Sequence, residues 1–566
     1  MSRAGEGAEA VPDRADVVFL NGRVLVMDAA DTVETALAVR DGAVCALGAE
    51  AEALVPSATR VVDMAGGTLL PGINDSHCHA VAWGMTRPPL MLDLGYPAVT
   101  SIADIVDRVR VAVAAAEPGA WITGTGWDLG FLDECMREPG RLPTKEELDA
   151  VAPDNPVFLA DLSYHAAWLN SAALERADVD AARWPHLVPV NAGGEPIGIL
   201  YEGVMHAVSE LLPAIDAADR RLAAENALAE LTALGITSIT EPGLGPGDAA
   251  GGMAQATYEV YEALQREGRL TMRVSVLRYP VPMDTGLAEF SAALERMAPP
   301  SIADPRVLNV LGVKIFGDGI PSARTSWMHE PYVGGGVGAL TVPGATDEER
   351  VAELRAMIAH AHGLGHQVGV HITGDRGIDT VVEAFAAAVD GDGREDSRHY
   401  VIHGDFITPH SLELCCRYGF GVNMNPTIKW TIADLEKEFV GIERAAYAWP
   451  YRSALDAGVM VASGSDAPVT APDWRQGVAT MMTRRSKASG EVSGPDQVIT
   501  LHEALRTYTT AGAWQDFAES WKGTLEVGMV ADLCLVAEDL LAIDPAAIPG
   551  VQVRMTVFNG NVVHEI

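Results

Sequence analysis

Residues 69–79 read Leu69-Leu-Pro-Gly-Ile-Asn-Asp-Ser-His-Cys-His79, and this stretch decides the fold that we expect. A short apolar run, broken by Pro-Gly and ending in two histidines, predicts a buried strand whose carboxyl tip carries both imidazoles. Side chains two residues apart in an extended chain point to the same side, so His77 and His79 could reach one metal ion, whereas Cys78 points the other way. Taken alone, such a pair is equally compatible with solvated or backbone-bonded histidines.

Four further ligand-type residues end apolar, strand-like runs later in the chain. They are Lys314 in the run 310–318, His371 in 367–371, His403 in 400–403 and Asp466 in 459–466. Side chains from the carboxyl ends of several strands converge at the active site of a (β/α)8 barrel. The recurrence therefore favours a metal site at these strand ends over isolated surface histidines.

Lys314 is the unusual member of this set, because a protonated amine cannot bind a metal ion. On a buried strand between two cations, its neutral amine could take up CO2 and form a carbamate, which would bridge two metals as a carboxylate does. The alternative is a structural lysine that pairs with Asp318 or extends its ammonium group to solvent.

From Thr68 onward, apolar runs alternate with amphipathic helical stretches, a pattern typical of a parallel α/β barrel. The other barrel strands are expected at 237–240, 272–277 and 420–424, and helices between the strands at 222–234, 346–362 and 377–389. The expected fold is therefore of the α/β class, with a TIM (β/α)8 barrel formed by residues 67–85 and 221–519.

Both ends of the chain contain short strand-like runs separated by tight turns such as Asn21-Gly22 and Asn559-Gly560. We expect residues 16–66 and 520–566 to form one small β-sandwich domain, preceded by a flexible N-terminus at residues 1–15.

A long insertion separates the first two barrel strands, which lie roughly 150 residues apart although a barrel connection needs about a dozen. We assign residues 86–220 to this insertion, which contains an expected helix at 102–116 and an expected strand at 156–161. Because it leaves the barrel after the first strand, at the end where active sites lie, we expect it to act as a substrate lid.

The composition excludes several classes of partner. The 77 acidic and 40 basic residues give a formal net charge of −37, which would repel nucleic acids and anionic membrane surfaces. The six cysteines show no paired spacing, which argues against a disulfide framework. Neither a signal-peptide core nor an apolar span of about 18 residues is found. We expect a cytoplasmic enzyme without membrane or nucleic-acid partners, and the charge is compatible with a monomer or a homo-oligomer.

Some histidines do not belong to the expected site. His360, His362 and His366 lie at the end of an expected helix, which Gly363 and Gly365 interrupt, and they precede the next strand. This position places them at the opposite face of the barrel from the ligands. His399 stands at the start of its strand and is set aside for the same reason.

Several local motifs occur in a family-specific order. They are Gly126-Trp-Asp128, Ser163-Tyr-His165-Ala-Ala-Trp168-Leu-Asn170, Lys314-Ile-Phe-Gly-Asp318-Gly319, Ala323-Arg324-Thr325, His371-Ile-Thr-Gly-Asp375, Gly464-Ser-Asp466-Ala-Pro468 and Gly523-Thr-Leu-Glu-Val-Gly528. With His77-x-His79, they resemble the amidohydrolase superfamily, and in particular amidohydrolase family 3, which includes N-substituted formamide deformylases. The sequence departs from the family pattern at Asn74, Ile372-Thr373 and Gly404-Asp405, beside the ligands.

The resemblance implies a TIM barrel of the metal-dependent-hydrolase type and a binuclear centre with two divalent metal ions, zinc being the expected metal. His77 and His79 would hold the more buried ion with Asp466, His371 and His403 the more exposed one, and a carbamate on Lys314 would bridge them. Asp466 and Lys314 are thus the expected catalytic residues, with Asp466 moving the proton. The residues expected to contact the substrate are Asp128, His165, Trp168, Asn170 and Arg324.

The expected function is the metal-dependent hydrolysis of a non-peptide carbon–nitrogen bond in a small amide, an N-substituted formamide being one candidate. A deaminase, a cyclic-amide hydrolase or an ester hydrolase of the same superfamily is the alternative. A deaminase usually carries a glutamate after the fifth strand, which His371-Ile-Thr-Gly374 lacks. A metal-free binding protein on the same barrel is the least favoured hypothesis, since all six ligand positions are filled.

Overall fold

A computed structural model describes residues 14–96, 98–138, 140–162, 166–184, 187–209, 211–248, 251–297 and 302–566. The predicted flexible N-terminus therefore lies almost entirely outside the described residues. The chain divides into two compact units, which are described separately. One unit comprises Val81–Ala227 with Ala250–Gly252, and the other comprises the rest of the chain.

An eight-stranded parallel sheet forms the centre of the larger unit, in the order β20-β19-β18-β17-β16-β15-β14-β8. Its strands are β8 (Ile73–Asp75), β14 (Ile236–Leu244), β15 (Arg273–Arg278), β16 (Leu308–Phe316), β17 (Gln367–Ile372), β18 (Tyr400–His403), β19 (Gly421–Met424) and β20 (Met460–Ser463). The N–H of Ser76, directly after β8, donates to the carbonyl of Ser463, the last residue of β20, at 3.1 Å and so joins the two end strands of the sheet.

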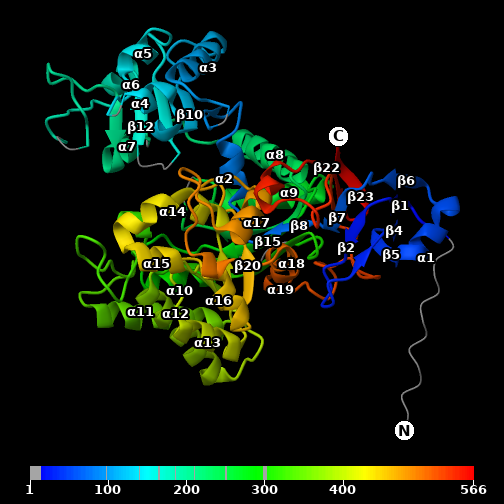
Figure 1. The fold of residues 1–566 in the computed structure, drawn as a ribbon. Helices are drawn as coiled ribbons and strands as arrows, with labels where there is room; N and C mark the ends of the chain where they lie inside the picture. Colours follow the sequence, from blue (N-terminus) through cyan, green and yellow to red (C-terminus); the bar gives the residue numbers. More distant parts are fainter. Residues whose placement is uncertain are drawn as a thin grey trace. The chain divides into compact units, whose positions relative to one another are not determined.

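Helices follow the strands around this sheet (Figure 1). They are α9 (Gln255–Arg266), α10 (Leu287–Arg296), α11 (Asp347–Gly363), α12 (Asp375–Asp392), α13 (Pro409–Tyr418), α14 (Pro426–Val440), α15 (Ile442–Tyr447), α16 (Tyr451–Asp456), α17 (Trp474–Thr483), α18 (Leu501–Thr507) and α19 (Thr510–Gln515). The α8 helix (Ala217–Ala233) has residues in both units. The alternation confirms the predicted TIM barrel of the α/β class.

Local chemistry explains why the best-predicted elements form. The α11 helix begins where the Thr346 side chain accepts the Glu349 N–H, and three acidic residues in its first turn favour the positive end of the helix dipole. The α12 helix ends at Gly393, whose φ of +75° suits a residue without Cβ. Every residue of β17 is buried, as expected for a parallel strand covered on both faces.

The apolar run that begins the quoted stretch was wrongly assigned to the barrel. Thr68–Pro71 is strand β7, which pairs with β2 (Arg23–Leu25) and β21 (Leu533–Val536) in a different sheet. The barrel strand β8 starts only after Gly72, where a Cβ would lie 2.0 Å from the Thr237 hydroxyl. Gly72 lets the backbone pass close to Thr237, and the residues before and after it belong to two different sheets.

Both ends of the chain build two further sheets in the larger unit (Figure 1). One contains β1 (Val17–Leu20), β4 (Leu37–Arg40), β5 (Ala43–Leu47) and β6 (Arg60–Asp63), with α1 (Gly48–Ala53) beside them; the other contains β2, β3 (Val33–Glu34), β7, β21, β22 (Val553–Phe558) and β23 (Asn561–Glu565). Both sheets contribute to one buried cluster, which joins Phe19 and Val39 to Leu535 and Val557. We call this part the terminal β-domain.

The smaller unit is an α/β insertion with its own cores. Its sheet has the order β13-β12-β11-β10-β9, with β9 (Leu92–Asp93), β10 (Ile122–Trp127), β11 (Val157–Asp161), β12 (Ala166–Leu169) and β13 (Ile199–Tyr201). Its helices are α2 (Ala80–Met85), α3 (Ile102–Ala115), α4 (Asp133–Arg137), α5 (Lys145–Asp149), α6 (Ser171–Arg176) and α7 (Glu202–Ser209). The predicted helix at 102–116 and strand at 156–161 correspond closely to α3 and β11.

A buried polar layer inside the barrel explains Asn74, the polar residue at a position where the family pattern is apolar. The Asn74 side-chain amide donates to Asp516 at 3.1 Å, and Lys522 donates to the same carboxylate at 2.6 Å. Thr240 donates to the other oxygen of Asp516 at 3.1 Å. This network ties strands β8 and β14 to the segment after α19, so Asn74 has a structural role.

None of the helices in the described part of the chain is long and apolar enough to span a membrane.

Candidate metal centre

The loops that follow the first and last barrel strands are joined by backbone hydrogen bonds. The Asp466 N–H donates to the His77 carbonyl at 2.7 Å, and the His79 N–H donates to the Ala467 carbonyl at 3.0 Å. The buried Asp75 carboxylate accepts the backbone N–H groups of Ser465 and His77. This pairing brings together ligand residues that lie almost 400 positions apart in the sequence.

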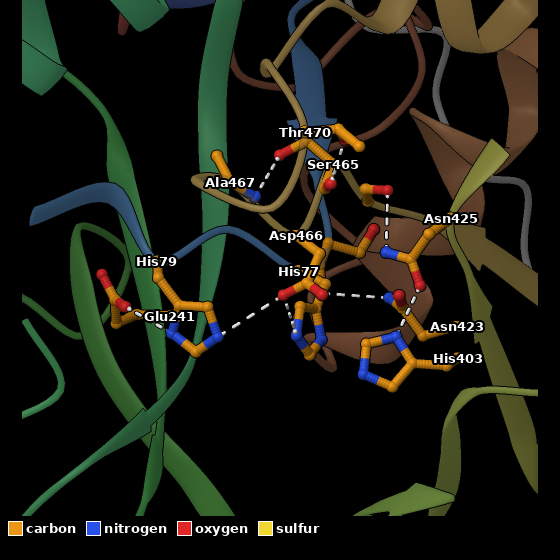
Figure 2. A network of polar contacts seen from close by, with 12 residues as sticks. His77, His79, Glu241, His403, Asn423, Asn425, Ser465, Asp466, Ala467 and Thr470 are labelled. Carbon is orange, nitrogen blue, oxygen red and sulfur yellow. Dashed lines mark hydrogen bonds and ion pairs between the residues drawn. The ribbon is translucent and has the colours of Figure 1, made fainter. Parts of the chain in front are cut away.

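His77, His79 and Asp466 form the centre of the site (Figure 2). The Nε2 atoms of His77 and His79 lie 3.1 and 3.5 Å from the same Asp466 oxygen, Oδ1. One ligand atom from each residue lies within 4.8 Å of the other two, which is a spacing that one ion could occupy. Asp466 has a φ of +56°, an uncommon conformation for a residue other than glycine, and such backbone strain clusters at functional sites.

His371 and His403 extend this group. The His403 ring centroid lies 5.1 Å from that of His77 and 4.6 Å from that of His371. His403 Nδ1 lies 2.8 Å from the Asn425 side-chain oxygen, and His371 Nε2 lies 3.1 Å from the Gly319 carbonyl. Both acceptors hold a ring proton on one nitrogen and leave the other nitrogen of each ring with a free lone pair.

Lys314 is buried among these residues, at the end of β16. Burial lowers the pKa of its amine to about 8, while the Asp466 carboxylate opposes this change. Its Nζ lies 4.8 Å from the centre of the Phe316 ring. Lys314 therefore loses its proton, and forms the neutral amine that a carbamate requires, at a lower pH than an ordinary lysine does.

The donor set fits divalent metal ions. Burial holds the pKa values of His77 and His403 well below the ordinary range and lowers that of His371 to about 4, so the three rings are neutral and have lone pairs to share. The Nε2 atom of His77 is buried and, although it lies 3.1 Å from Asp466 Oδ1, has no partner of hydrogen-bond geometry among the described residues. Buried polar atoms normally have partners, and a metal ion would supply the missing one.

Glu241 is a site residue that the sequence analysis missed. It lies in β14, is fully buried, and places Oε1 3.5 Å from His79 Nδ1 (Figure 2). Its Oε2 accepts the Ala80 N–H and the Tyr261 hydroxyl. The available signal was an acidic residue directly after the predicted strand 237–240, a position equivalent to those of the other site residues.

Two loops at the carboxyl end of the barrel are held together by Asp318. Its Oδ2 accepts the backbone N–H groups of Trp327 and Gly374, and its Oδ1 accepts that of Thr373. Burial raises the pKa of Asp318 to about 7 despite these bonds. Lys314 does not pair with this aspartate in the described structure, so the structural alternative for Lys314 loses its proposed partner.

The residues predicted to contact the substrate have very different environments. Trp168 is fully buried in the insertion and donates from its indole to the Thr144 carbonyl. The Asn170 side chain caps α6 and also bonds to Val157, Ala152 and Asn155. These contacts give both residues structural roles and do not support the predicted substrate contact.

The other three predicted contacts differ from one another. Asp128 accepts the Gly130 N–H at 2.7 Å and so shapes its own turn. Arg324, after β16, is exposed, and no carboxylate pairs with it in the part of the chain that the structure describes. His165 lies outside the described residues.

The comparison with known families decides the classification. A family model described as the amidohydrolase family matches residues 60–564. This chain belongs to the amidohydrolase family. It is therefore a metal-dependent amidohydrolase, an enzyme that hydrolyses carbon–nitrogen bonds other than peptide bonds.

Individual relatives resemble almost the whole chain. YtcJ of Bacillus subtilis (strain 168), named as an amidohydrolase, is 27% identical over 525 residues, which cover 90% of this chain and 91% of YtcJ. An N-substituted formamide deformylase of Arthrobacter pascens is 26% identical over 561 residues, covering 96% and 97% of the two chains. An uncharacterized metal-dependent hydrolase from Pyrococcus furiosus has a similar structure, with a TM-score of 0.68 at 25% identity over 94% of this chain and 99% of that one.

Proposed function

We propose that this amidohydrolase cleaves the amide bond of a small molecule at a binuclear centre. The observation that carries the proposal is the convergence of His77, His79 and Asp466 with His371, His403 and the buried Lys314. In this proposal His77 and His79 hold one ion with Asp466, and His371 and His403 hold the other. A carbamate on Lys314 would supply a carboxylate-like ligand to both ions. Zinc suits a set of imidazole and carboxylate ligands.

The residues of the chain have distinct tasks in the proposed reaction. Bound divalent ions polarise the carbonyl of the amide and lower the pKa of water from 15.7 to about 7. Asp466 accepts the proton of the attacking water and delivers it to the leaving nitrogen. Asn425 and the Gly319 carbonyl keep the rings of His403 and His371 in one tautomer, so their ligand nitrogens need no rearrangement.

The proposed substrate class is the N-substituted formamides. Support comes from the relative of that name, which matches nearly the whole chain at 26% identity. Arg324 is an exposed cation after β16 that could bind an anionic or carbonyl group of the substrate. The insertion at residues 86–220 follows the first barrel strand in the sequence, and its role as a substrate lid stays a prediction. His165 and Asp128 remain candidate contacts from this insertion.

A panel of substrates tests this function. Purified enzyme is incubated with N-substituted formamides, the matching acetamides, a cyclic amide and an amino-substituted heterocycle, and formate, amine and ammonia are measured. Release of formate and amine in equal amounts, lost in Asp466→Asn, is the expected result. Ammonia release from the heterocycle without amide cleavage would favour the deaminase alternative, although the glutamate expected after the fifth strand is absent.

A further inference from the structure

Glu241 and His79 present two unpartnered buried atoms to each other. Glu241 Oε1 and His79 Nδ1 each have no hydrogen-bond partner among the described residues, and they lie 3.5 Å apart. This distance is at the outer limit of a hydrogen bond. Because an unpaired polar atom is costly inside a protein, each atom is the natural partner of the other.

The position of the ligand atoms fixes the proton on the His79 ring. His79 Nε2 lies on the side of Asp466 and His77, in the group that could hold an ion. A neutral imidazole has one N–H, so Nε2 can bind a cation only when the proton is on Nδ1. Nδ1 is the nitrogen that faces Glu241 (Figure 2).

Glu241 does not belong to the ligand group itself. In Figure 2 the His79 ring lies between Glu241 and Asp466, so the glutamate is separated from the ligand atoms by the width of an imidazole. Its second oxygen, Oε2, is held by the Tyr261 hydroxyl at 2.7 Å and by the Ala80 N–H at 3.2 Å. These two donors fix the carboxylate in place and leave Oε1 for His79.

We infer that Glu241 is a positioning residue for the metal centre. It accepts the Nδ1 proton of His79, fixes the ring with Nε2 toward the ion, and increases the electron density on that nitrogen, while Tyr261 holds Glu241 in this orientation. A carboxylate behind a ligating histidine strengthens metal binding. This inference rests on the proposed function only in requiring a metal at His77, His79 and Asp466.

Metal affinity, measured without reference to catalysis, tests the inference. The metal-free protein is titrated with Zn2+ against a chromophoric chelator, and Co2+ spectra report the ligand geometry. We expect Glu241→Gln to weaken binding of the tighter ion about 10–100-fold and to change the Co2+ spectrum. Tyr261→Phe is expected to weaken binding by a smaller factor, because the carboxylate remains but loses one of its two donors.

Glu436→Gln is the matched control. Glu436 is also a fully buried glutamate, but it pairs with Lys429 at 2.6 Å in α14 and touches none of the ligands. We expect this variant to lower the melting temperature and to leave metal affinity unchanged. Unchanged Zn2+ affinity and Co2+ spectrum in Glu241→Gln would overturn the inference. If that variant does not fold, unchanged affinity in Tyr261→Phe overturns it.

The two proposals fail in different ways. If none of the amides is hydrolysed but Glu241→Gln still loses metal affinity, the proposed substrate class is wrong and the positioning role stands. If amides are hydrolysed and Glu241→Gln binds metal normally, the positioning role is wrong and the proposed function stands.

Discussion

At the scale of single residues, Gly464 shows how closely the metal centre is packed. A Cβ on Gly464 would lie 2.5 Å from the backbone nitrogen of His77 and 2.6 Å from its Cβ. Gly464→Ala must therefore displace the loop that carries His77. Because displacements of about 1 Å at a reacting site can cost about 100-fold in rate, we expect a loss of this size in kcat/KM, together with reduced metal content.

Gly363→Ala is the control for this prediction. Nothing lies within 4 Å of the position its Cβ would take, at the end of α11, so activity and metal content should stay as in the parent enzyme. Normal metal content and activity in Gly464→Ala would contradict the packing argument.

The convergence of the candidate ligands could be predicted where a ligand-type residue stands at the end of a predicted strand. His371 and His403 end apolar runs, and the structure places their rings together. Glu241 directly follows the predicted strand 237–240 but was overlooked, because a single acid at a strand tip is common and only its distance from His79 points to the proposed role. For Trp168 and Asn170 the structure shows structural contacts, and a motif alone does not indicate whether its side chains face a pocket or a core.

At the scale of elements, a pair of buried histidines links α11 to the start of β18. His399 Nδ1 accepts the Val368 N–H, so its Nε2 carries the proton and lies 2.7 Å from His362 Nδ1. His362 Nε2 lies 2.9 Å from Asp392, at the end of α12. Two of the histidines that the sequence analysis set aside, His362 and His399, are therefore joined to each other and to this aspartate.

This pair predicts a pH dependence of stability. Burial, together with the nearby His362 and Arg394, holds the pKa of His399 well below its ordinary value of 6.5, and only Asp392 opposes this shift. The unfolded chain therefore binds a proton below pH 6.5 that the folded chain does not. The contribution of His399 to stability is complete above pH 6.5 and is lost as the pH falls below that value, at a rate approaching about 1.4 kcal/mol per pH unit.

Urea unfolding of the parent and of His399→Gln between pH 5 and pH 8 measures this effect. The variant should be less stable at pH 8, because the Val368 N–H loses its acceptor, but its stability should fall less steeply below pH 6.5. The histidines common to both proteins cancel in the comparison. If the free energy of unfolding fell equally steeply below pH 6.5 in both proteins, the assignment of this pH dependence to His399 would be contradicted.

Elements were predicted well where a single pattern governs them. The amphipathic stretches at 346–362 and 377–389 correspond to α11 and α12, with differences of a few residues at the ends. The assignment of Thr68–Pro71 to the barrel was wrong because an apolar pattern indicates burial but does not indicate which sheet the strand joins. The pairing of β7 with β21, more than 460 residues away, could not be read from either segment alone.

At the scale of the whole molecule, a buried ion pair connects the barrel to the terminal β-domain. Arg273 of β15 forms two hydrogen bonds with Asp532, at 2.6 and 3.0 Å, and both side chains are almost fully buried. Asp532 also accepts the Asn559 N–H. Removing one partner of such a pair leaves an uncompensated buried charge, which costs about 3–5 kcal/mol.

We therefore expect Arg273→Met to lower the free energy of unfolding by about 3–5 kcal/mol, while molecules that remain folded keep their metal. Chemical denaturation monitored by circular dichroism measures the loss. Arg137→Ala removes the exposed pair with Asp133 and should change stability by less than about 1 kcal/mol. A similarly small change in Arg273→Met would show that this ion pair does not hold the two parts together.

The binuclear centre is tested most directly by the metal content per chain in the parent and in Lys314→Ala. Plasma mass spectrometry measures it on protein purified without chelators. We predict about two ions per chain in the parent and the loss of metal and activity in the variant, because the carbamate of Lys314 would bridge both ions. A single ion per chain, retained in Lys314→Ala, would contradict the binuclear centre and direct the search toward a mononuclear reaction such as deamination.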